Sequence, residues 1–215
     1  MKIIKWITIV SCVLLIQCSS SNIVSSRMIL EPINLETGRI VVVAILKEED
    51  KSLCKQMENH LAADLCNLGY DAISSIELYG FKTIEGLDEK QIVSKLMKDD
   101  IPAVLTIVLL SKQKEKNHVP KSMFDLEERY NTNDFSIYYT AIHNKIYEEG
   151  YYVNNTNYFW ESNLFSVSDQ KFIYSVQTQS FNPFNKASLA HEYGKLIIDD
   201  MLKNNIIKDI HKSRE

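Results

Sequence analysis

Two almost unbroken apolar runs constrain the fold of this chain more than any other feature. Residues 40–46 read Ile-Val-Val-Val-Ala-Ile-Leu, and residues 103–110 read Ala-Val-Leu-Thr-Ile-Val-Leu-Leu. A strand with one exposed face alternates apolar and polar side chains, whereas these runs carry apolar side chains on both faces and are rich in β-branched residues. They therefore predict central strands of a sheet that helices cover.

The segments around these runs predict a repeating strand and helix order. Residues 50–68 form an amphipathic helix with an apolar stripe at i, i+4 and i+8, and Gly69 follows its last turn. Residues 70–78 predict a second strand. Residues 88–98 predict a second helix that ends before Pro102. The resulting order is β-α-β-α-β, for which parallel strands joined by right-handed crossovers are expected.

The C-terminal part of the chain predicts a different arrangement. Residues 155–167 and 170–181 predict an antiparallel hairpin, and residues 186–204 predict a last amphipathic helix. The predicted fold class is α/β, as a three-layer-like single domain over residues 38–207 with a mixed sheet. A charged tail is expected over residues 208–215.

The first residues predict an export signal. Lys2 and Lys5 flank the start of an apolar run over residues 6–16. As a helix this run would be only ~16 Å long, whereas the apolar core of a bilayer is roughly 30 Å thick. Residues 1–17 therefore predict a cleaved signal peptide.

The end of this signal resembles the lipobox of bacterial lipoproteins. Leu15-Ile16-Gln17-Cys18 has the expected leucine three positions before the cysteine, although Gln17 stands where a small residue is usual. The resemblance implies that Cys18 carries the lipid; Cys12 is the less favoured alternative. Residues 18–37 are then expected to form a lipidated tether. Ser19 implies sorting to the outer membrane, with the domain facing the periplasm.

Charge and cysteine content narrow the function further. The chain has 24 basic and 28 acidic residues, a net charge of −4, and loss of Lys2 and Lys5 with the signal leaves 22 against 28, or −6. Nucleic acid is therefore not expected as a partner.

Cys54 and Cys66 lie twelve residues apart on one predicted helix. That is ~18 Å, too far for a disulfide, so two buried, inert thiols are expected.

The segment over residues 112–152 is polar and predicts a long loop of functional importance. Eight of the eleven tyrosines fall between residues 130 and 174. Tyrosine supplies interface area at a low entropic cost, so we expect a surface that contacts a protein partner. The alternative is that these rings pack within the sheet and an ordered loop. The expected contact residues are Tyr138, Tyr139, Tyr147, Tyr151 and Tyr152.

The sequence offers few candidate catalytic, ligand-binding or metal-binding residues. Glu48, Glu49 and Asp50 follow the first predicted strand, at the sheet edge where open α/β folds often bind ligands, although a solvated turn is the simpler interpretation. His60 and Asp64 lie one helical turn apart, but a pair without a third ligand more often marks a solvated helix face. We expect no catalytic residue, metal or cofactor.

Several local patterns resemble an uncharacterised lipoprotein family of Bacteroidetes-like bacteria. They are the strand 40–46, Leu68-Gly69-Tyr70-Asp71-Ala72, Pro102-Ala103-Val104-Leu105, Gly150-Tyr151-Tyr152 and the hairpin 160–181. The element order is also similar to periplasmic domains of the curli-secretion lipoprotein and of lipoprotein activators of penicillin-binding proteins. These resemblances imply a membrane-anchored, non-enzymatic binding or assembly module of the cell envelope. The alternatives are a periplasmic hydrolase or a small-ligand sensor that uses the carboxylates at the strand edge.

Overall fold

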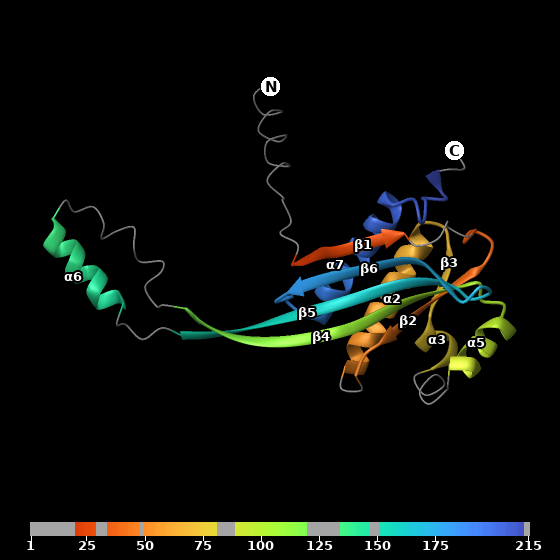
Figure 1. Ribbon diagram of the computed structural model, residues 1–215, viewed down its shortest axis with the longest axis horizontal. Coiled ribbons are helices and arrows are strands. Elements are labelled where there is room, and N and C mark those ends of the chain that lie inside the picture. Colours follow the sequence, from red (N-terminus) through yellow and green to blue (C-terminus); the bar gives the residue numbers. More distant parts are fainter. Residues whose placement is uncertain are drawn as a thin grey trace, which may run out of the picture.

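The computed structural model describes residues 20–28, 34–47, 50–80, 89–119, 134–146 and 151–212. Figure 1 shows a sheet with helices packed against it and a long two-stranded extension. The strands are β1 (Ser21–Met28), β2 (Arg39–Ile45), β3 (Asp71–Ser74), β4 (Ala103–Val119), β5 (Tyr151–Ser166) and β6 (Lys171–Phe181). The helices are α2 (Lys51–Asn67), α3 (Ser75–Tyr79), α5 (Glu89–Lys98), α6 (Phe135–Ile146) and α7 (Lys186–Lys203).

The six strands form one mixed sheet in the order β1-β6-β5-β4-β2-β3. β2 pairs in parallel with both β3 and β4, whereas the pairs β4–β5, β5–β6 and β6–β1 are antiparallel. The predicted α/β class is therefore confirmed, including the β-α-β-α-β order, the hairpin and the C-terminal helix. None of the described helices combines the length and the apolar composition needed to cross a bilayer.

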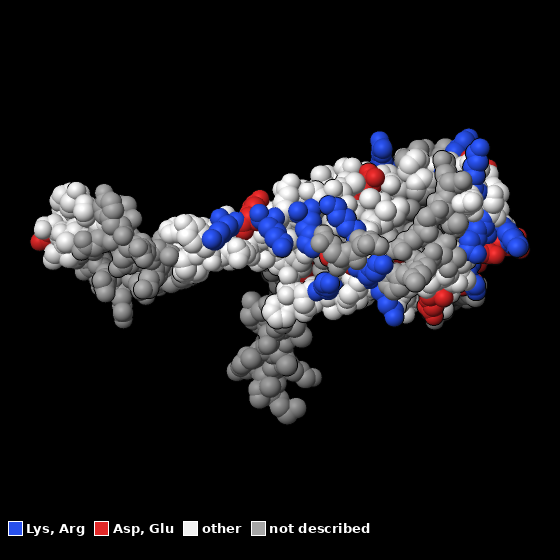
Figure 2. Space-filling model, turned by 90° about the horizontal axis from the view of Figure 1, so that it is seen from below, with Lys and Arg blue, Asp and Glu red and all other residues white. Residues whose placement is uncertain are grey.

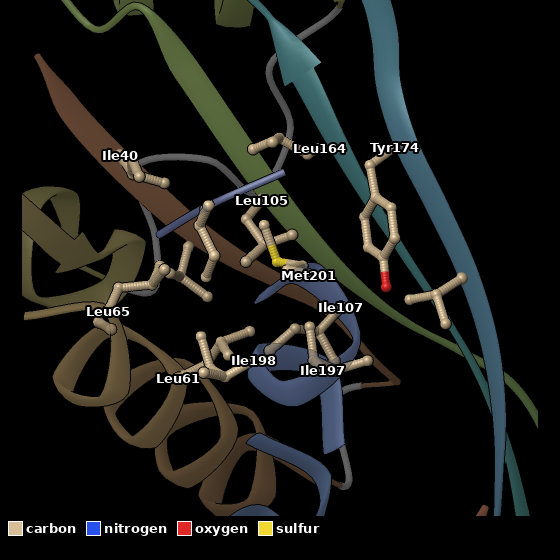
Figure 3. Packing of buried hydrophobic residues seen from close by; sticks show 14 of the residues in the cluster. Ile40, Leu61, Leu65, Leu105, Ile107, Leu164, Tyr174, Ile197, Ile198 and Met201 are labelled. Carbon is tan, nitrogen blue, oxygen red and sulfur yellow. The ribbon is translucent and has the colours of Figure 1, made fainter. Parts of the chain in front are cut away.

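The two apolar runs lie on inner strands of the sheet, as predicted, and their first residues are buried on both faces, whereas Ile45 and Leu110 near their ends are exposed. Ile40 and Val42 belong to the main core beneath α2 and α7, whereas Val41 packs on the opposite face with Leu96 of α5. Figure 3 shows side chains of α2 and α7 meeting those of the strands; the labelled residues are Ile40, Leu61, Leu65, Leu105, Ile107, Leu164, Tyr174, Ile197, Ile198 and Met201. Full burial of each such aliphatic side chain stabilises the fold by about 1.5–3 kcal/mol.

The strand predicted over residues 70–78 is shorter in the structure. β3 ends at Ser74, and the chain turns directly into α3. The Ser74 side chain accepts a hydrogen bond from the Glu77 N–H at 3.3 Å, which is the usual bond of a helix N-cap. The local capping serine thus overrides the β-branched pattern. At the end of α2, Gly69 has φ +95°, the left-handed backbone that favours glycine there.

The tether predicted over residues 18–37 contains β1, which pairs with β6 at the edge of the sheet. The apolar pattern of the sequence does not indicate this strand, because its inward-facing residues are serines. Ser21 hydrogen-bonds Ser180 at 2.7 Å, and Ser26 donates to Asp200. The domain therefore begins before residue 38.

The predicted charged tail also contributes to the core. Ile210 is buried, and its backbone N–H donates to the Leu68 carbonyl at 2.9 Å.

The prediction of a long loop over residues 112–152 is wrong at both ends, because β4 continues to Val119 and β5 already begins at Tyr151. Within it, α6 forms a further helix.

Candidate functional site: the projecting ribbon

The C-terminal half of β4 and the start of β5 form a two-stranded ribbon that extends beyond the rest of the sheet. The β5–β6 pairing stops at the pair Asn157–Phe181, whereas β4 and β5 continue for six more pairs, from Lys114–Thr156 to Val119–Tyr151. Six antiparallel pairs span ~20 Å. Figure 1 shows the ribbon leading away from the body toward α6.

Lysines alternate along one face of the C-terminal half of β4, at Lys112, Lys114 and Lys116, and two of them lie over tyrosine rings. Lys112 Nζ lies 5.6 Å from the centroid of the Tyr158 ring, and Lys116 Nζ lies 4.7 Å from that of Tyr152. The His118 ring packs edge-on against Tyr152 at 5.2 Å. Figure 2 shows basic side chains along the ribbon between the body and its far end. Cation–π contacts of this kind hold both partners in place at a surface that water reaches on both faces.

Aromatic residues are exposed on α6. Phe135 and Tyr139 are one helical turn apart and their ring centroids lie 6.0 Å from each other, with Tyr138 on the same side of the helix. Phe135 is 76% exposed, Tyr138 44% and Tyr139 57%. The helix starts at a local cap, because the Asp134 carboxylate accepts the N–H of Ser136 at 2.8 Å. An exposed apolar stripe of this kind is typical of an interaction surface.

The residues predicted to contact a partner are distributed over α6 and the end of the ribbon. Tyr138 and Tyr139 lie on α6, while Tyr151 and Tyr152 begin β5 and are 51% and 60% exposed. Tyr147 lies outside the described residues. All four described rings are therefore accessible, and their role in partner contact stays a prediction.

The carboxylates predicted at the strand edge have a different environment. Glu48 and Glu49 lie outside the described residues. The Asp50 side chain is only 8% exposed and forms an ion pair with Lys112, whose Nζ lies 3.2 and 3.3 Å from the two carboxylate oxygens. The Asp50 carboxylate therefore joins the start of α2 to β4. Sequence alone could not show this pair, because the two residues are 62 positions apart.

The proposed lipidation site, Cys18, also lies outside the described residues, and the described chain begins two positions later, at Ser20, which contacts the body of the domain. The Ser20 N–H and Oγ donate to Glu192 of α7 at 2.9 and 2.7 Å. The backbone carbonyl of Ser20 accepts from the Phe181 N–H at 2.7 Å. Because Phe181 pairs with Asn157 at the base of the ribbon, the chain enters the sheet at the same end from which the ribbon projects.

A small apolar cavity of about 180 Å³ lies on the sheet face opposite α2. Tyr79 and Lys95 border it, and the Tyr79 hydroxyl donates to Asp99 at 2.8 Å. Burial, together with this hydrogen bond, raises the pKa of Tyr79 to about 12. No sequence pattern indicates this cavity, because apolar residues of separate elements line it. The aliphatic side chains around it are Val41, Val43, Ile45, Ile92, Leu96 and Val104.

The two cysteines differ from their predicted burial. Cys54 is half-buried and donates to the Ala44 carbonyl at 3.3 Å, whereas Cys66 is exposed. Both are free thiols, in agreement with the distance argument.

Comparisons with known proteins give only distant similarities. No protein-family model and no curated protein matches the chain, so the expected Bacteroidetes family gains no support. Among solved structures, a PelC dodecamer from Paraburkholderia phytofirmans is similar, with 12% identity, a TM-score of 0.44, and coverage of 80% of this chain and 94% of that one. Lipoprotein GNA1162 from Neisseria meningitidis is similar with 13% identity, a TM-score of 0.43, and coverage of 77% and 99%. TM-scores below 0.5 support no functional inference for this chain.

Proposed function

We propose that this chain is a membrane-anchored lipoprotein that acts as a non-enzymatic binding or assembly module in the bacterial cell envelope. The exposed aromatic stripe of α6, together with Tyr151 and Tyr152 at the ribbon end, carries the proposal. Aromatic side chains that project from the body suit the capture of a protein partner. The lipobox-like segment ending at Cys18 supports the anchoring.

The arrangement of the chain fits an anchored module. Residue 18 is two positions before Ser20, so the chain between them spans at most ~7 Å. A lipid on Cys18 would therefore hold the ribbon end of the sheet near the membrane. Ser19 supports sorting to the outer membrane. Comparing membrane fractions of cells that express the wild type and Cys18→Ala tests both parts: the variant should lose its outer-membrane association, and retention there would contradict the anchor.

In-cell cross-linking followed by mass spectrometry tests the contact surface. Replacing Tyr138, Tyr139, Tyr151 and Tyr152 together with serine should abolish recurrent capture of a partner, because the stripe loses most of its aromatic area. The fold should persist, since all four rings are exposed.

The matched control replaces exposed aromatic residues on the body of the domain. Phe172 and Phe184 are exposed on and after β6, and their change to serine should leave capture intact. Equal capture by the tyrosine variant and the wild type would contradict the proposed surface.

The apolar cavity favours a second candidate function, the sensing of a small apolar ligand. A dry cavity of about 150 Å³ is sufficient to bind a molecule the size of benzene. Addition of benzene should then shift the NMR signals of Val43 and Val104, which line the cavity. A Val43→Phe substitution, which fills the cavity, should abolish those shifts; identical shifts in both proteins would exclude the site.

A further inference from the structure

Two histidines from different helices meet at the interface of α2 and α7. The centroids of the His60 and His191 rings lie 5.0 Å apart, and His60 Nε2 lies 3.2 Å from His191 Nδ1. On its other side, His60 Nδ1 lies 3.2 Å from an Asp64 carboxylate oxygen. The three side chains thus form a connected series, Asp64–His60–His191. The sequence spacing indicates only the contact between Asp64 and His60.

The packing of the helices builds this arrangement. Asp64 follows His60 by one turn of α2, and Gly194 of α7 lies against both. A Cβ atom at position 194 would lie 2.6 Å from Asp64 Oδ2 and 3.6 Å from His60 Nδ1. Only the absence of a side chain there leaves room for the carboxylate behind the ring. Glycine inside a helix is less favourable than alanine, so α7 gives up helix stability to accommodate Asp64.

The carboxylate determines which nitrogen of His60 is available. Asp64 accepts a hydrogen bond from the Nδ1–H, which fixes the tautomer and directs the Nε2 lone pair toward His191. Two imidazole nitrogens that share a tetrahedral metal at 2.0–2.1 Å are roughly 3.3–3.4 Å apart. The 3.2 Å separation between the two rings is close to this value. Without a metal, the same distance accommodates a hydrogen bond from the His191 Nδ1–H.

We propose that His60 and His191 bind one divalent transition-metal ion of the zinc or copper(II) class, with Asp64 as the carboxylate that orients His60. Imidazole suits these ions, and copper(II) should bind more tightly than zinc. The described residues contain no group of three or more metal-ligating side chains, so water completes the coordination. Access is open, because His191 is exposed and the His60 side chain is 32% exposed. The site is independent of the ribbon and of the proposed partner contact.

The test uses the full chain with Cys66→Ser in every variant, so that the exposed thiol binds no ion. Zn²⁺ is titrated by calorimetry, and Cu²⁺ is bound for electron paramagnetic resonance. We expect one equivalent of Zn²⁺, and Cu²⁺ hyperfine structure from two nitrogens. His60→Gln and His191→Gln should each weaken binding at least tenfold, and Asp64→Asn should weaken it 10- to 100-fold. Zn²⁺ should also raise the Tm of the parent protein, because it joins α2 to α7.

The matched controls are His118→Gln and His143→Gln, which change exposed histidines on other elements and should leave binding unchanged. Spectra that show one nitrogen or none, or affinity that survives both site variants, would overturn the proposal. If a site variant loses its metal-free fold, the number of nitrogens coordinated in the parent protein still decides the question.

Discussion

Glu58 is a residue at which several parts of the fold meet. It lies on α2, and its side chain is almost fully buried at 1% exposure. The carboxylate accepts hydrogen bonds from the Ala44 N–H at 2.7 Å, Ser74 Oγ at 2.8 Å, Ser75 Oγ at 2.9 Å and the Ile76 N–H at 3.0 Å. These donors belong to β2, β3 and α3. A buried carboxylate is tolerated only when its oxygens are satisfied in this way.

Glu58→Gln should lower the free energy of unfolding by about 2–3 kcal/mol, because the amide NH₂ would face hydrogen-bond donors and leave them unsatisfied. Urea unfolding at neutral pH measures the effect. Glu77→Gln is the matched control, since Glu77 is exposed at the start of α3, and its change should cost less than about 0.5 kcal/mol. Equal stabilities of the two variants would show that the Glu58 network contributes little.

Single residues were the least predictable part of the candidate site. Tyr138 and Tyr139 could be selected from composition, because exposed aromatic residues in a polar segment are unusual. The pairs Asp50–Lys112 and His60–His191 could not be predicted from the sequence, because each pair joins residues that lie far apart in it. Such pairs depend on strand order and helix packing, which a periodic pattern does not specify.

At the scale of elements, burial determined what could be predicted. The doubly buried strands β2 and β4 and the amphipathic helices α2 and α7 have strong apolar patterns, and each was predicted to within a few residues at its N-terminus. β1 and the distal part of β4 were missed, because a polar edge strand and a two-stranded ribbon have few inward-facing apolar positions. Their stability comes from backbone pairing, which residues of almost any type can supply.

The ribbon should be dispensable for folding. Beyond the pair Lys114–Thr156 the two strands pair only with each other, and residues 112–118 of β4 are mostly exposed. Replacing residues 115–155 with an Asn-Gly turn should therefore shift Tm by only a few degrees, since none of the described core residues lies in this segment. The same variant should lose partner capture in the cross-linking experiment. A large drop in Tm would instead show that the ribbon or α6 stabilises the body.

At the scale of the whole molecule, buried tyrosines join α7 to the sheet. The Tyr174 hydroxyl of β6 donates to Asp200, which also accepts from Ser26 of β1. The Tyr193 hydroxyl of α7 forms a hydrogen bond with Ser162 of β5. The last helix is thereby connected to three strands, including the N-terminal strand that the pattern missed. Closure of the domain thus depends on hydroxyl groups that must keep their protons.

The fold should lose stability in alkali for this reason. Burial raises the pKa of Tyr193 well above its ordinary value of 10, and burial followed by the hydrogen bond to Asp200 does the same for Tyr174. Above pH 10 the unfolded chain releases these protons while the folded chain keeps them. Each tyrosine then lowers the free energy of unfolding by about 1.4 kcal/mol per pH unit, whereas its contribution is fully present below pH 10.

Urea unfolding between pH 8 and 11.5 measures this loss, and comparing slopes separates the tyrosines from the titrating lysines. Above pH 10, Tyr193→Phe should lose its free energy of unfolding less steeply with pH than the wild type, by about 1.4 kcal/mol per pH unit. The reason is that phenylalanine has no proton to release. Tyr139→Phe, which changes an exposed ring on α6, should leave the slope as it is in the wild type. If Tyr193→Phe and the wild type lose stability equally, the Tyr193 hydroxyl ionises as easily in the folded chain as in the unfolded one. In that case the hydrogen bond between Tyr193 and Ser162 is not a buried contact that requires a protonated tyrosine, and it does not hold α7 against the sheet in that way.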